Sequence, residues 1–212
     1  MNRSFVVVGT KATASPSFSL LDIAGTSGRL DVLLRCARSA LLVSHGMRRE
    51  ARIYLVLQGG DLAPRVVRID GAEVRFLRPD ERALATLAQK VLTEAKADAP
   101  PGEFIDVRPG VAVARGDIEV AIADLARRGP FAPLLLEEGA ADLREAAIDP
   151  SSHVVVFVGD HFGFDERSQA SIAALEPLRA SLGPVSVHAD DAVAVVSNEL
   201  DRRAARSEAR AR

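Results

Sequence analysis

The sequence predicts an α/β fold in which a parallel sheet lies between helices, and three observations favour it. Leu, Ala and Val dominate a chain of 212 residues that is 48% hydrophobic, as expected where buried parallel strands alternate with helices. Short apolar runs bounded by turn residues predict strands, whereas other segments repeat apolar residues at helical spacing. From residue 117 onward the two patterns alternate regularly. We expect one domain over residues 1–212, long enough to bury a sizeable core.

A long loop separates the first predicted strand from the first predicted helix. Residues 4–9 (SFVVVG) have the β-branched character of a strand, and residues 10–29 are polar and interrupted by Pro and Gly. A helix begins at Leu30, because apolar residues recur from there at i, i+3 and i+4 spacing. These residues are Leu30, Leu33, Leu34, Ala37 and Leu41. Arg29 and Asp31 lie outside this stripe, so we expect both at the surface.

The middle of the chain predicts strands, a helix and one loose stretch. Residues 51–60 read as a strand that ends in a Gly-Gly turn, and residues 65–77 as a hairpin of two short strands around Asp70-Gly71. Residues 79–95 begin with proline and acids and keep their apolar residues on one side, which indicates a helix. Residues 96–116 are rich in Pro and Gly, and they fit either a short hairpin or a hinge.

The C-terminal part ends in a long helix. The expected elements are a helix at 117–128, strands at 131–139 and 153–160, a helix at 166–181, a strand at 184–188 and a helix at 189–205. Val193, Val195, Val196 and Leu200 make the last helix apolar enough to pack in a dimer, although it could instead pack on its own sheet. Residues 201–212 carry five Arg against one Asp and one Glu, which favours a solvated helix end over an arm that contacts RNA.

Composition excludes several classes of function. With 27 basic and 29 acidic residues the net charge is -2, so the chain cannot bind nucleic acid by bulk charge, although a local basic patch remains possible. An aromatic content of 4% disfavours an RNA-binding sheet that stacks bases on aromatic side chains. Cys36 is the only cysteine, which favours a reducing cytoplasm. We find no signal peptide and no apolar run of about 20 residues that could span a membrane.

The common catalytic motifs are missing from the sequence. It contains no nucleophile elbow, no phosphate-binding P-loop and no zinc-protease motif. The four histidines, His45, His153, His161 and His188, lack the spacing of metal ligands, so we expect no metal site.

Three stretches place a glycine where a predicted strand passes into a loop. They are 134–139 (LLLEEG), 158–163 (VGDHFG) and 181–188 (SLGPVSVH). In a parallel sheet the carboxyl ends of the strands share one edge, where ligands bind against free backbone groups. Glycine also lets backbone approach a flat heterocycle closely. The alternative is that these glycines only end strands, as they do in many α/β proteins.

The start of the helix at Leu30 is a second candidate site. Gly25 and Gly28 flank two small polar residues, and Arg29 and Asp31 stand on either side of Leu30. A helix N-terminus of this kind can hold a phosphate. It can equally be an ordinary helix cap with a charge pair whose side chains never meet.

Four stretches together carry a family resemblance over nearly the whole chain. They are AGTSGRLDVLLRCARSALLVSHGMRRE, RPDERALA, VFVGDHFGF and VSVHADDAVAVVSNELD. The sequence resembles the tRNA pseudouridine N1-methyltransferases of the SPOUT class, known mainly from archaea and with bacterial relatives. The resemblance implies a homodimeric α/β protein with a C-terminal trefoil knot, an exception to the usual rules of chain connectivity. It also implies that S-adenosylmethionine binds in the knot against the backbone of three loops.

By position, the resemblance assigns the cofactor contacts to the three glycine-bearing stretches. They are Leu135; Gly159 and Gly163; Leu182, Gly183, Pro184, Val185 and Val187; and Ala192. A valine at Gly159 would therefore enter the space of the ligand. Ala192 departs from the archaeal pattern, which has Cys there, in HANHC rather than HADDA. Alanine keeps a backbone contact but supplies no thiol.

The activity implied by the resemblance is methylation of pseudouridine N1 in RNA, and in the archaeal relatives the target is position 54 of the tRNA T-loop. The target base must be flipped out to reach a buried methyl group. Asp31 is the candidate general base or orients the uracil edge, and Arg29 is the candidate contact for a phosphate or carbonyl. Arg35, Arg48, Arg49 and Arg82 are the candidate contacts to the RNA backbone. Two alternatives stay open: a SPOUT enzyme that methylates another base or a ribose 2′-OH, and a non-catalytic RNA-binding dimer.

Overall fold

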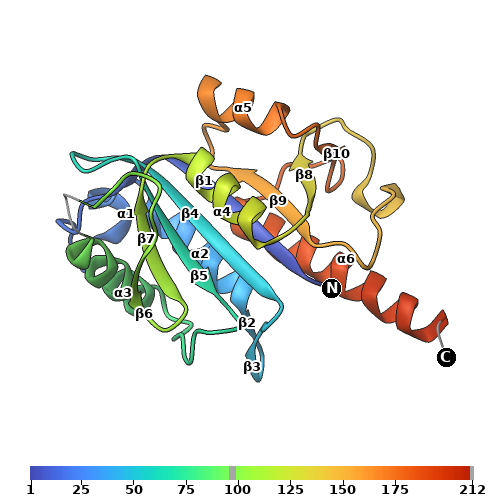
Figure 1. Ribbon diagram of the computed structural model, residues 1–212, viewed down its shortest axis with the longest axis horizontal. Coiled ribbons are helices and arrows are strands. Elements are labelled where there is room, and N and C mark those ends of the chain that lie inside the picture. Colours follow the sequence, from blue (N-terminus) through green and yellow to red (C-terminus); the bar gives the residue numbers. More distant parts are fainter. Residues whose placement is uncertain (96–98, 211–212) are drawn as a thin grey trace.

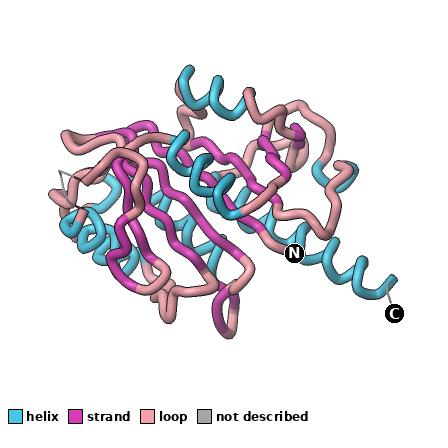
Figure 2. The backbone as a smooth tube through the Cα atoms, in the orientation of Figure 1, coloured by secondary structure: helices cyan, strands magenta, loops and turns pink. Residues whose placement is uncertain are grey.

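A sheet of eight strands forms the centre of the protein, as the computed structural model of residues 1–95 and 99–210 shows (Figures 1 and 2). The strand order is β10-β8-β9-β1-β4-β5-β7-β6. Its strands are β1 (Arg3–Thr13), β4 (Ala51–Gly59), β5 (Arg65–Asp70), β6 (Ile105–Arg108), β7 (Val111–Arg115), β8 (Ala132–Leu136), β9 (Val154–Gly159) and β10 (Leu178–Ala180). A separate two-stranded ribbon pairs β2 (Leu42–Val43) with β3 (Gly46–Met47).

The sheet is parallel over one part and antiparallel over the other. Strands β10, β8, β9, β1 and β4 are parallel neighbours, whereas β5, β7 and β6 extend the sheet with antiparallel pairings. The predicted α/β fold is confirmed, with a sheet that is mostly rather than wholly parallel. Because parallel strands run in one direction, the carboxyl ends of β8 and β9 lie at the same edge of the sheet.

Helices cover both faces of the sheet. They are α1 (Ile23–Thr26), α2 (Leu30–Leu41), α3 (Glu81–Glu94), α4 (Ile118–Arg128), α5 (Glu166–Ala173) and α6 (Ala189–Arg210), with a short 3-10 turn, η1, at Leu143–Glu145. Residues of α2, α3 and α6 belong to the core on one face, and residues of α4 and α5 to the core on the other. In Figure 1, α4 lies in front of the strands and α2 behind them.

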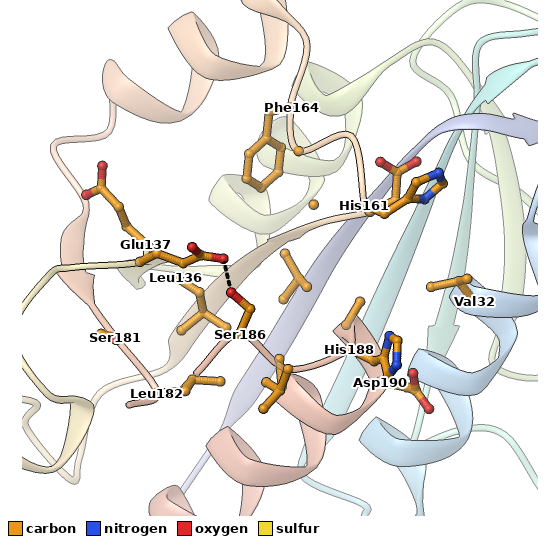
Figure 3. Close-up of a pocket in the computed structure, with 18 of the residues that line it drawn as sticks. Val32, Leu136, Glu137, His161, Phe164, Ser181, Leu182, Ser186, His188 and Asp190 are labelled. Carbon is orange, nitrogen blue, oxygen red and sulfur yellow. Dashed lines mark hydrogen bonds between the residues drawn. The ribbon is translucent and has the colours of Figure 1, made fainter. Parts of the chain in front are cut away.

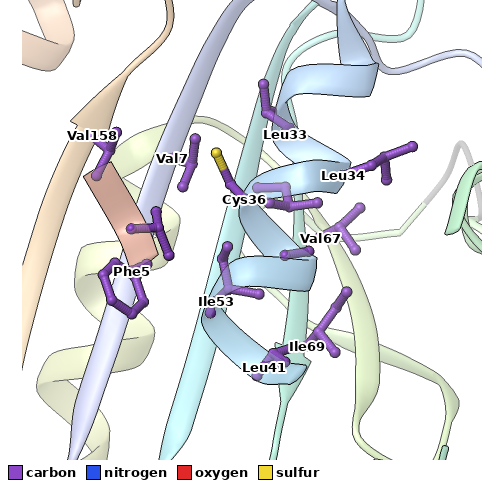
Figure 4. Packing of buried hydrophobic residues seen from close by; sticks show 14 of the residues in the cluster. Phe5, Val7, Leu33, Leu34, Cys36, Leu41, Ile53, Val67, Ile69 and Val158 are labelled. Atoms are coloured by element: carbon purple, nitrogen blue, oxygen red, sulfur yellow. The ribbon is translucent and has the colours of Figure 1, made fainter. Parts of the chain in front are cut away.

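Strand β1 shows why both faces need a helical cover. Phe5 and Val7 pack on the α2 side and Val6 and Val8 on the α4 side, and all four are fully buried. Side chains of successive strand residues point to opposite faces, so an unbroken apolar run fits a strand that is buried on both. Figure 4 shows Val7 beside Cys36 of α2, with Phe5 further along the same strand.

Most predicted elements are confirmed. Strands occur at 4–9, 51–60, 131–139 and 153–160 and helices at 30–41, 79–95, 117–128 and 189–205, within a few residues of the expected limits. Residues 105–115 form the short hairpin allowed for the loose stretch and make the edge of the sheet. Residues 96–98 of that stretch, and 211–212 of the basic tail, lie outside the described residues. The rest of the tail, to Arg210, continues α6.

The predicted hairpin around Asp70-Gly71 is wrong. Strand β5 pairs with β4 on one side and with β7 on the other, so no place beside it is left for residues 72–77. The backbone N–H of Gly71 instead donates to the Ala51 carbonyl at 2.9 Å. The chain turns away here because a non-local partner, β7, takes the position that the local hairpin would need.

The prediction for residues 166–188 is also wrong in part. Helix α5 ends at Ala173, and residues 178–180 form strand β10 beside β8. Glu176 has a positive φ of 50°, which does not continue a helix. Pro177 follows it, and a proline disfavours a helical conformation at the residue before it. Residues 184–188, predicted as a strand, form a loop. The two valines of this loop, Val185 and Val187, line the pocket described next.

Candidate active site

A pocket of about 850 Å³ opens where β8, β9 and β10 pass into their loops (Figure 3). This volume is in the range of small-molecule sites in proteins. It is lined by Arg29, Val32, Arg35, Leu136, Glu137, Glu138, Val158, Gly159, Asp160, His161, Gly163, Phe164, Ala180, Ser181, Leu182, Gly183, Val185, Ser186, Val187, His188, Ala189, Asp190 and Ala192. The structure thus brings the three glycine-bearing stretches together with the start of α2 and of α6.

Most residues assigned to the cofactor lie in this pocket, and two do not. Gly159, Gly163, Leu182, Gly183, Val185, Val187 and Ala192 line it. Leu135 instead packs against the core on the α4 side, and its neighbour Leu136 lines the pocket. The reason is the alternation of β8, which sends successive side chains to opposite faces. Pro184 is exposed and is not among the lining residues.

Asp160 builds the loop that follows β9. Its carboxylate accepts hydrogen bonds from the backbone N–H and the hydroxyl of Thr10, both at 2.8 Å. The other carboxylate oxygen accepts from the N–H of Phe162 at 2.8 Å, and the Gly163 N–H donates to the Asp160 carbonyl at 2.9 Å. One side chain therefore fixes the loop on itself and on the end of β1.

The structure requires glycine at position 159 for a reason that the sequence did not reveal. A Cβ at Gly159 would lie 2.7 Å from the carbonyl oxygen of Gly163, closer than van der Waals contact allows. The glycine thus permits the tight turn from Gly159 to Gly163. The expectation that a side chain here would enter the ligand space is incomplete, because it would first meet the loop itself.

The loop after β10 closes the other side of the pocket. The Ser181 N–H donates to the Ala141 carbonyl and the Leu143 N–H donates to the Ser181 carbonyl, each at 2.8 Å. The Ser186 hydroxyl donates to the Glu138 carboxylate at 2.5 Å, drawn as a dashed line in Figure 3. These bonds tie the segment that follows β10 to the segment that follows β8, which leaves the valines at 185 and 187 at the pocket wall.

Asp31 joins two arginines at the start of α2. Arg29 Nε donates to Asp31 Oδ1 at 3.1 Å and Arg35 Nη1 to Asp31 Oδ2 at 2.8 Å. Arg35 also lies 3.5 Å from a carboxylate oxygen of Glu81 and of Asp190. Burial raises the pKa of Asp31, but the hydrogen bonds from Arg29 and Arg35 outweigh it and hold the pKa below its ordinary value. The carboxylate is ionised at neutral pH.

Two expectations for this cluster are corrected by the structure. Asp31 is not at the surface, because its side chain is only 3% exposed, whereas Arg29 is half exposed as expected. The alternative in which the two charges never meet is also wrong. Arg29 has a positive φ of 69°, and this backbone turn brings its guanidinium back to Asp31. Arg29 and Arg35 line the pocket and Asp31 stands behind them.

The other arginines assigned to RNA lie away from the pocket lining. Arg48 is 2.7 Å from the Asp201 carboxylate, and Arg49 donates to the carbonyls of Gly71 and Val74. Arg82 is exposed on α3. Arg48 and Arg49 therefore have partners within the protein that account for their positions.

The sequence did not single out several residues that shape the pocket. Asp160 and Glu138 lie in stretches that the glycines marked, and the marker was the glycine rather than the carboxylate. Val32 was detectable, since it is an apolar residue off the buried stripe of α2 and it faces the pocket in Figure 3.

Within residues 1–95 and 99–210, we find no cluster of three or more His, Cys, Asp or Glu that could hold a metal ion. The described helices include none with the length and apolarity to cross a membrane.

Comparisons with known proteins find matches over nearly the full length of the chain. The sequence model of a family described as SAM-dependent RNA methyltransferases matches residues 2–205. The protein named tRNA (pseudouridine(54)-N(1))-methyltransferase from Methanococcoides burtonii is 36% identical over 202 residues, which cover 94% of this chain and 96% of that one. The protein of the same name from Halobacterium salinarum is 40% identical over 199 residues, with the same two coverages.

A solved structure shares the fold. The crystal structure of Archaeoglobus fulgidus Nep1 bound to S-adenosylhomocysteine superposes with a TM-score of 0.61, covering 95% of this chain and 98% of that one. Its sequence is 15% identical, so this likeness concerns the arrangement of the chain.

Proposed function

The chain belongs to the family of SAM-dependent tRNA pseudouridine N1-methyltransferases, and we propose that it methylates N1 of a pseudouridine in RNA, at tRNA position 54 as its relatives are named. The observation that carries this proposal is the agreement of sequence and site. Relatives with one stated activity match 94% of the chain, and their likeness includes the loops that meet at the pocket.

The pocket fits S-adenosylmethionine in size and in chemistry. Its walls combine apolar side chains, such as Leu136, Val158 and Leu182, with backbone from three loops. Gly163 and Gly183 have positive φ, and a Cβ on either would meet no atom within 4 Å, so the space beside them is open. Apolar walls suit the adenine ring and free backbone groups suit its edge. We assign the contacts to the lining residues given above, with Leu136 in place of Leu135.

S-adenosylmethionine supplies a sulfonium methyl group, so that methyl transfer forms the N1–CH₃ bond, breaks the S–CH₃ bond and releases S-adenosylhomocysteine and the N1 proton. The protein's part is to align N1 with this methyl group, and alignment alone can lower a barrier by about 7–11 kcal/mol. Arg29 and Arg35 line the pocket and can bind the uracil carbonyls or a phosphate. We propose that Asp31 positions both arginines rather than taking the proton, because its oxygens already accept their hydrogen bonds.

We further assign a C-terminal trefoil knot, a homodimer and a cytoplasmic location to the protein. The hydrogen bonds that join residues 181–186 to residues 138–143 support the knot. Of the four residues first considered for the dimer only Val195 is exposed, because Val193, Val196 and Leu200 are fully buried against the protein's own core. Val185 at 74%, Val187 at 46% and Val195 at 44% exposure supply the apolar surface instead. A single buried thiol, Cys36, suits a reducing compartment.

The test is methyl transfer from labelled S-adenosylmethionine to two tRNAs that differ only at position 54. We expect label in the tRNA with pseudouridine there and none in the tRNA with uridine. Equal labelling of both would indicate another base or a ribose 2′-OH as the target. Cofactor and RNA binding without any labelling would indicate the non-catalytic dimer, which Ala192 in place of Cys would then explain.

A further inference from the structure

An exposed aromatic side chain stands beside the pocket with a cation over it. Phe162 is 52% exposed and does not line the pocket, although its neighbours His161 and Gly163 do. The ammonium of Lys11 lies 4.2 Å from the centre of the Phe162 ring, and the His161 ring lies 3.9 Å from it. We call Lys11, His161 and Phe162 the Lys11 shelf. Burial in the core cannot explain an aromatic ring in this position.

The shelf is fixed relative to the pocket by Asp160. The same carboxylate accepts the Thr10 N–H, next to Lys11, and the N–H of Phe162. The carbonyl of Lys11 is also enclosed by two glycines, since a Cβ on Gly28 or Gly59 would approach it to 1.9 or 2.1 Å. Both halves of the shelf therefore sit on one hydrogen-bonded unit that also shapes the pocket loop.

Arg29 brings a second cationic side chain to the pocket, one residue after a glycine that packs on Lys11. Gly28 packs on the Lys11 backbone, and the next residue, Arg29, lines the pocket with its side chain half exposed. An aromatic ring with an ammonium over it has the chemistry of sites that bind single-stranded nucleic acid, where bases stack on rings and cations bind the phosphates. A flipped target base needs such support for its neighbours, which lose their own stacking.

We propose that the Lys11 shelf binds a nucleotide adjacent to the target pseudouridine, an inference that rests on the proposed function. The base of this nucleotide stacks on Phe162 in the place that the Lys11 ammonium occupies in the free protein. The ammonium then moves to the phosphate. The shelf thus acts on RNA binding and on positioning of the loop. Lys11 and Phe162, the two residues that bind the nucleotide, lie outside the pocket lining, so replacing them leaves S-adenosylmethionine binding unchanged.

The test measures binding of a fluorescent stem–loop RNA with pseudouridine at the target position, in the presence of S-adenosylhomocysteine, for Phe162→Leu, Phe162→Trp and Lys11→Met. Leucine keeps apolar surface but offers no ring, so we expect binding to weaken about tenfold, with tryptophan restoring it. Lys11→Met should reduce the salt dependence of log Kd by about 0.7, as for one phosphate contact on a single strand. Phe76→Leu and Lys90→Met, both exposed elsewhere, are matched controls.

The outcomes separate this inference from the proposed function. If wild type methylates the pseudouridine RNA but Phe162→Leu binds it as tightly as Phe76→Leu does, the shelf proposal is wrong and the function stands. If Phe162→Leu changes the sedimentation of the protein and leaves RNA binding unchanged, the shelf is a contact between protein copies. If wild type methylates no RNA, the proposed function fails first. Calorimetric affinity for S-adenosylhomocysteine should stay unchanged in all variants, and a loss would show a distorted pocket.

Discussion

Asp31 is a buried carboxylate that holds two arginines of the pocket lining and does not line the pocket itself. Arg29 and Arg35 reach the pocket from different turns of the chain, and the only protein groups that hold both in the described residues are the two oxygens of Asp31. The sequence suggested a surface residue because Asp31 lies off the apolar stripe of α2. Its side chain is instead only 3% exposed, and both of its oxygens accept hydrogen bonds from the arginines.

We expect Asp31→Ala to lower both stability and turnover. The variant leaves two arginines without their shared partner, which should cost about 1–3 kcal/mol of unfolding free energy, because both arginines are partly solvated. Asp31→Asn should retain part of the turnover, since the amide oxygen still accepts one hydrogen bond. A general base would instead lose about 10²–10⁴ in rate in both variants. Thermal melts and single-turnover rates of both variants distinguish the positioning role of Asp31 from the general-base role. Glu81→Gln, which changes the weaker partner of Arg35, is the control.

Gly159 carries a second prediction at this scale. Gly159→Ala should weaken S-adenosylmethionine binding and lower stability by about 1–3 kcal/mol, because the new Cβ displaces the Gly163 carbonyl. Gly163→Ala adds a Cβ in open space but strains a positive φ, at about 1–2 kcal/mol. Calorimetry and thermal melts compare the two. A Gly159→Ala protein with wild-type affinity and stability would mean that the turn has room to relax.

At the scale of elements, the sequence predicted what local pattern controls and missed what distant partners control. The stripe of α2 and the apolar run of β1 bury the same residues in the structure as in the prediction. The hairpin predicted around Asp70-Gly71 does not form, because β7, about forty residues later in the chain, occupies the position beside β5. Residues 184–188 have strand character, but β10 is the edge of the sheet and the loop bends over the pocket. The pocket itself was found through glycines at strand ends, which are local, whereas the Thr10–Asp160 bonds join distant segments.

The end of α5 gives a prediction about an element boundary. Glu176 has a φ of 50° just before Pro177, a conformation that costs a residue with a Cβ about 1–2 kcal/mol and glycine almost nothing. Glu176→Gly should therefore raise the melting temperature slightly. Glu166→Gly, in the first turn of α5, should lower it, because glycine in a helix is unfavourable by about 1 kcal/mol. Equal destabilisation by both would show that Glu176 adopts a helical conformation.

Across the whole molecule, α6 couples the N-terminal strand to the pocket. Its first residues, Ala189, Asp190 and Ala192, line the pocket, and further along Asp201 binds Arg3 at 2.8 Å and Arg48 at 2.7 Å. Arg3 is almost wholly buried and also donates to the Ser197 carbonyl at 2.9 Å. The position of the helix, and with it one wall of the pocket, thus depends on an ion pair at the far end of β1.

We expect Asp201→Asn to destabilise the protein by about 1–3 kcal/mol, because the buried Arg3 loses the nearer of its two carboxylate partners and keeps only Glu50, at 3.6 Å. Chemical denaturation measures the change. Glu208→Gln, exposed in the last turns of the same helix, should stay within about 0.5 kcal/mol of wild type. Equal stability of the two variants would mean that Glu50 and the backbone carbonyls are enough to satisfy Arg3.

The identity of the methylated nucleoside tests most directly whether this pocket methylates N1 of pseudouridine. A tRNA with pseudouridine at position 54 is incubated with the protein and S-adenosylmethionine, digested to nucleosides and analysed by mass spectrometry. We predict N1-methylpseudouridine, formed in equal amount with S-adenosylhomocysteine and formed more slowly by the Asp31→Ala protein. Methyl groups on a ribose or on an unmodified uridine would contradict the claim.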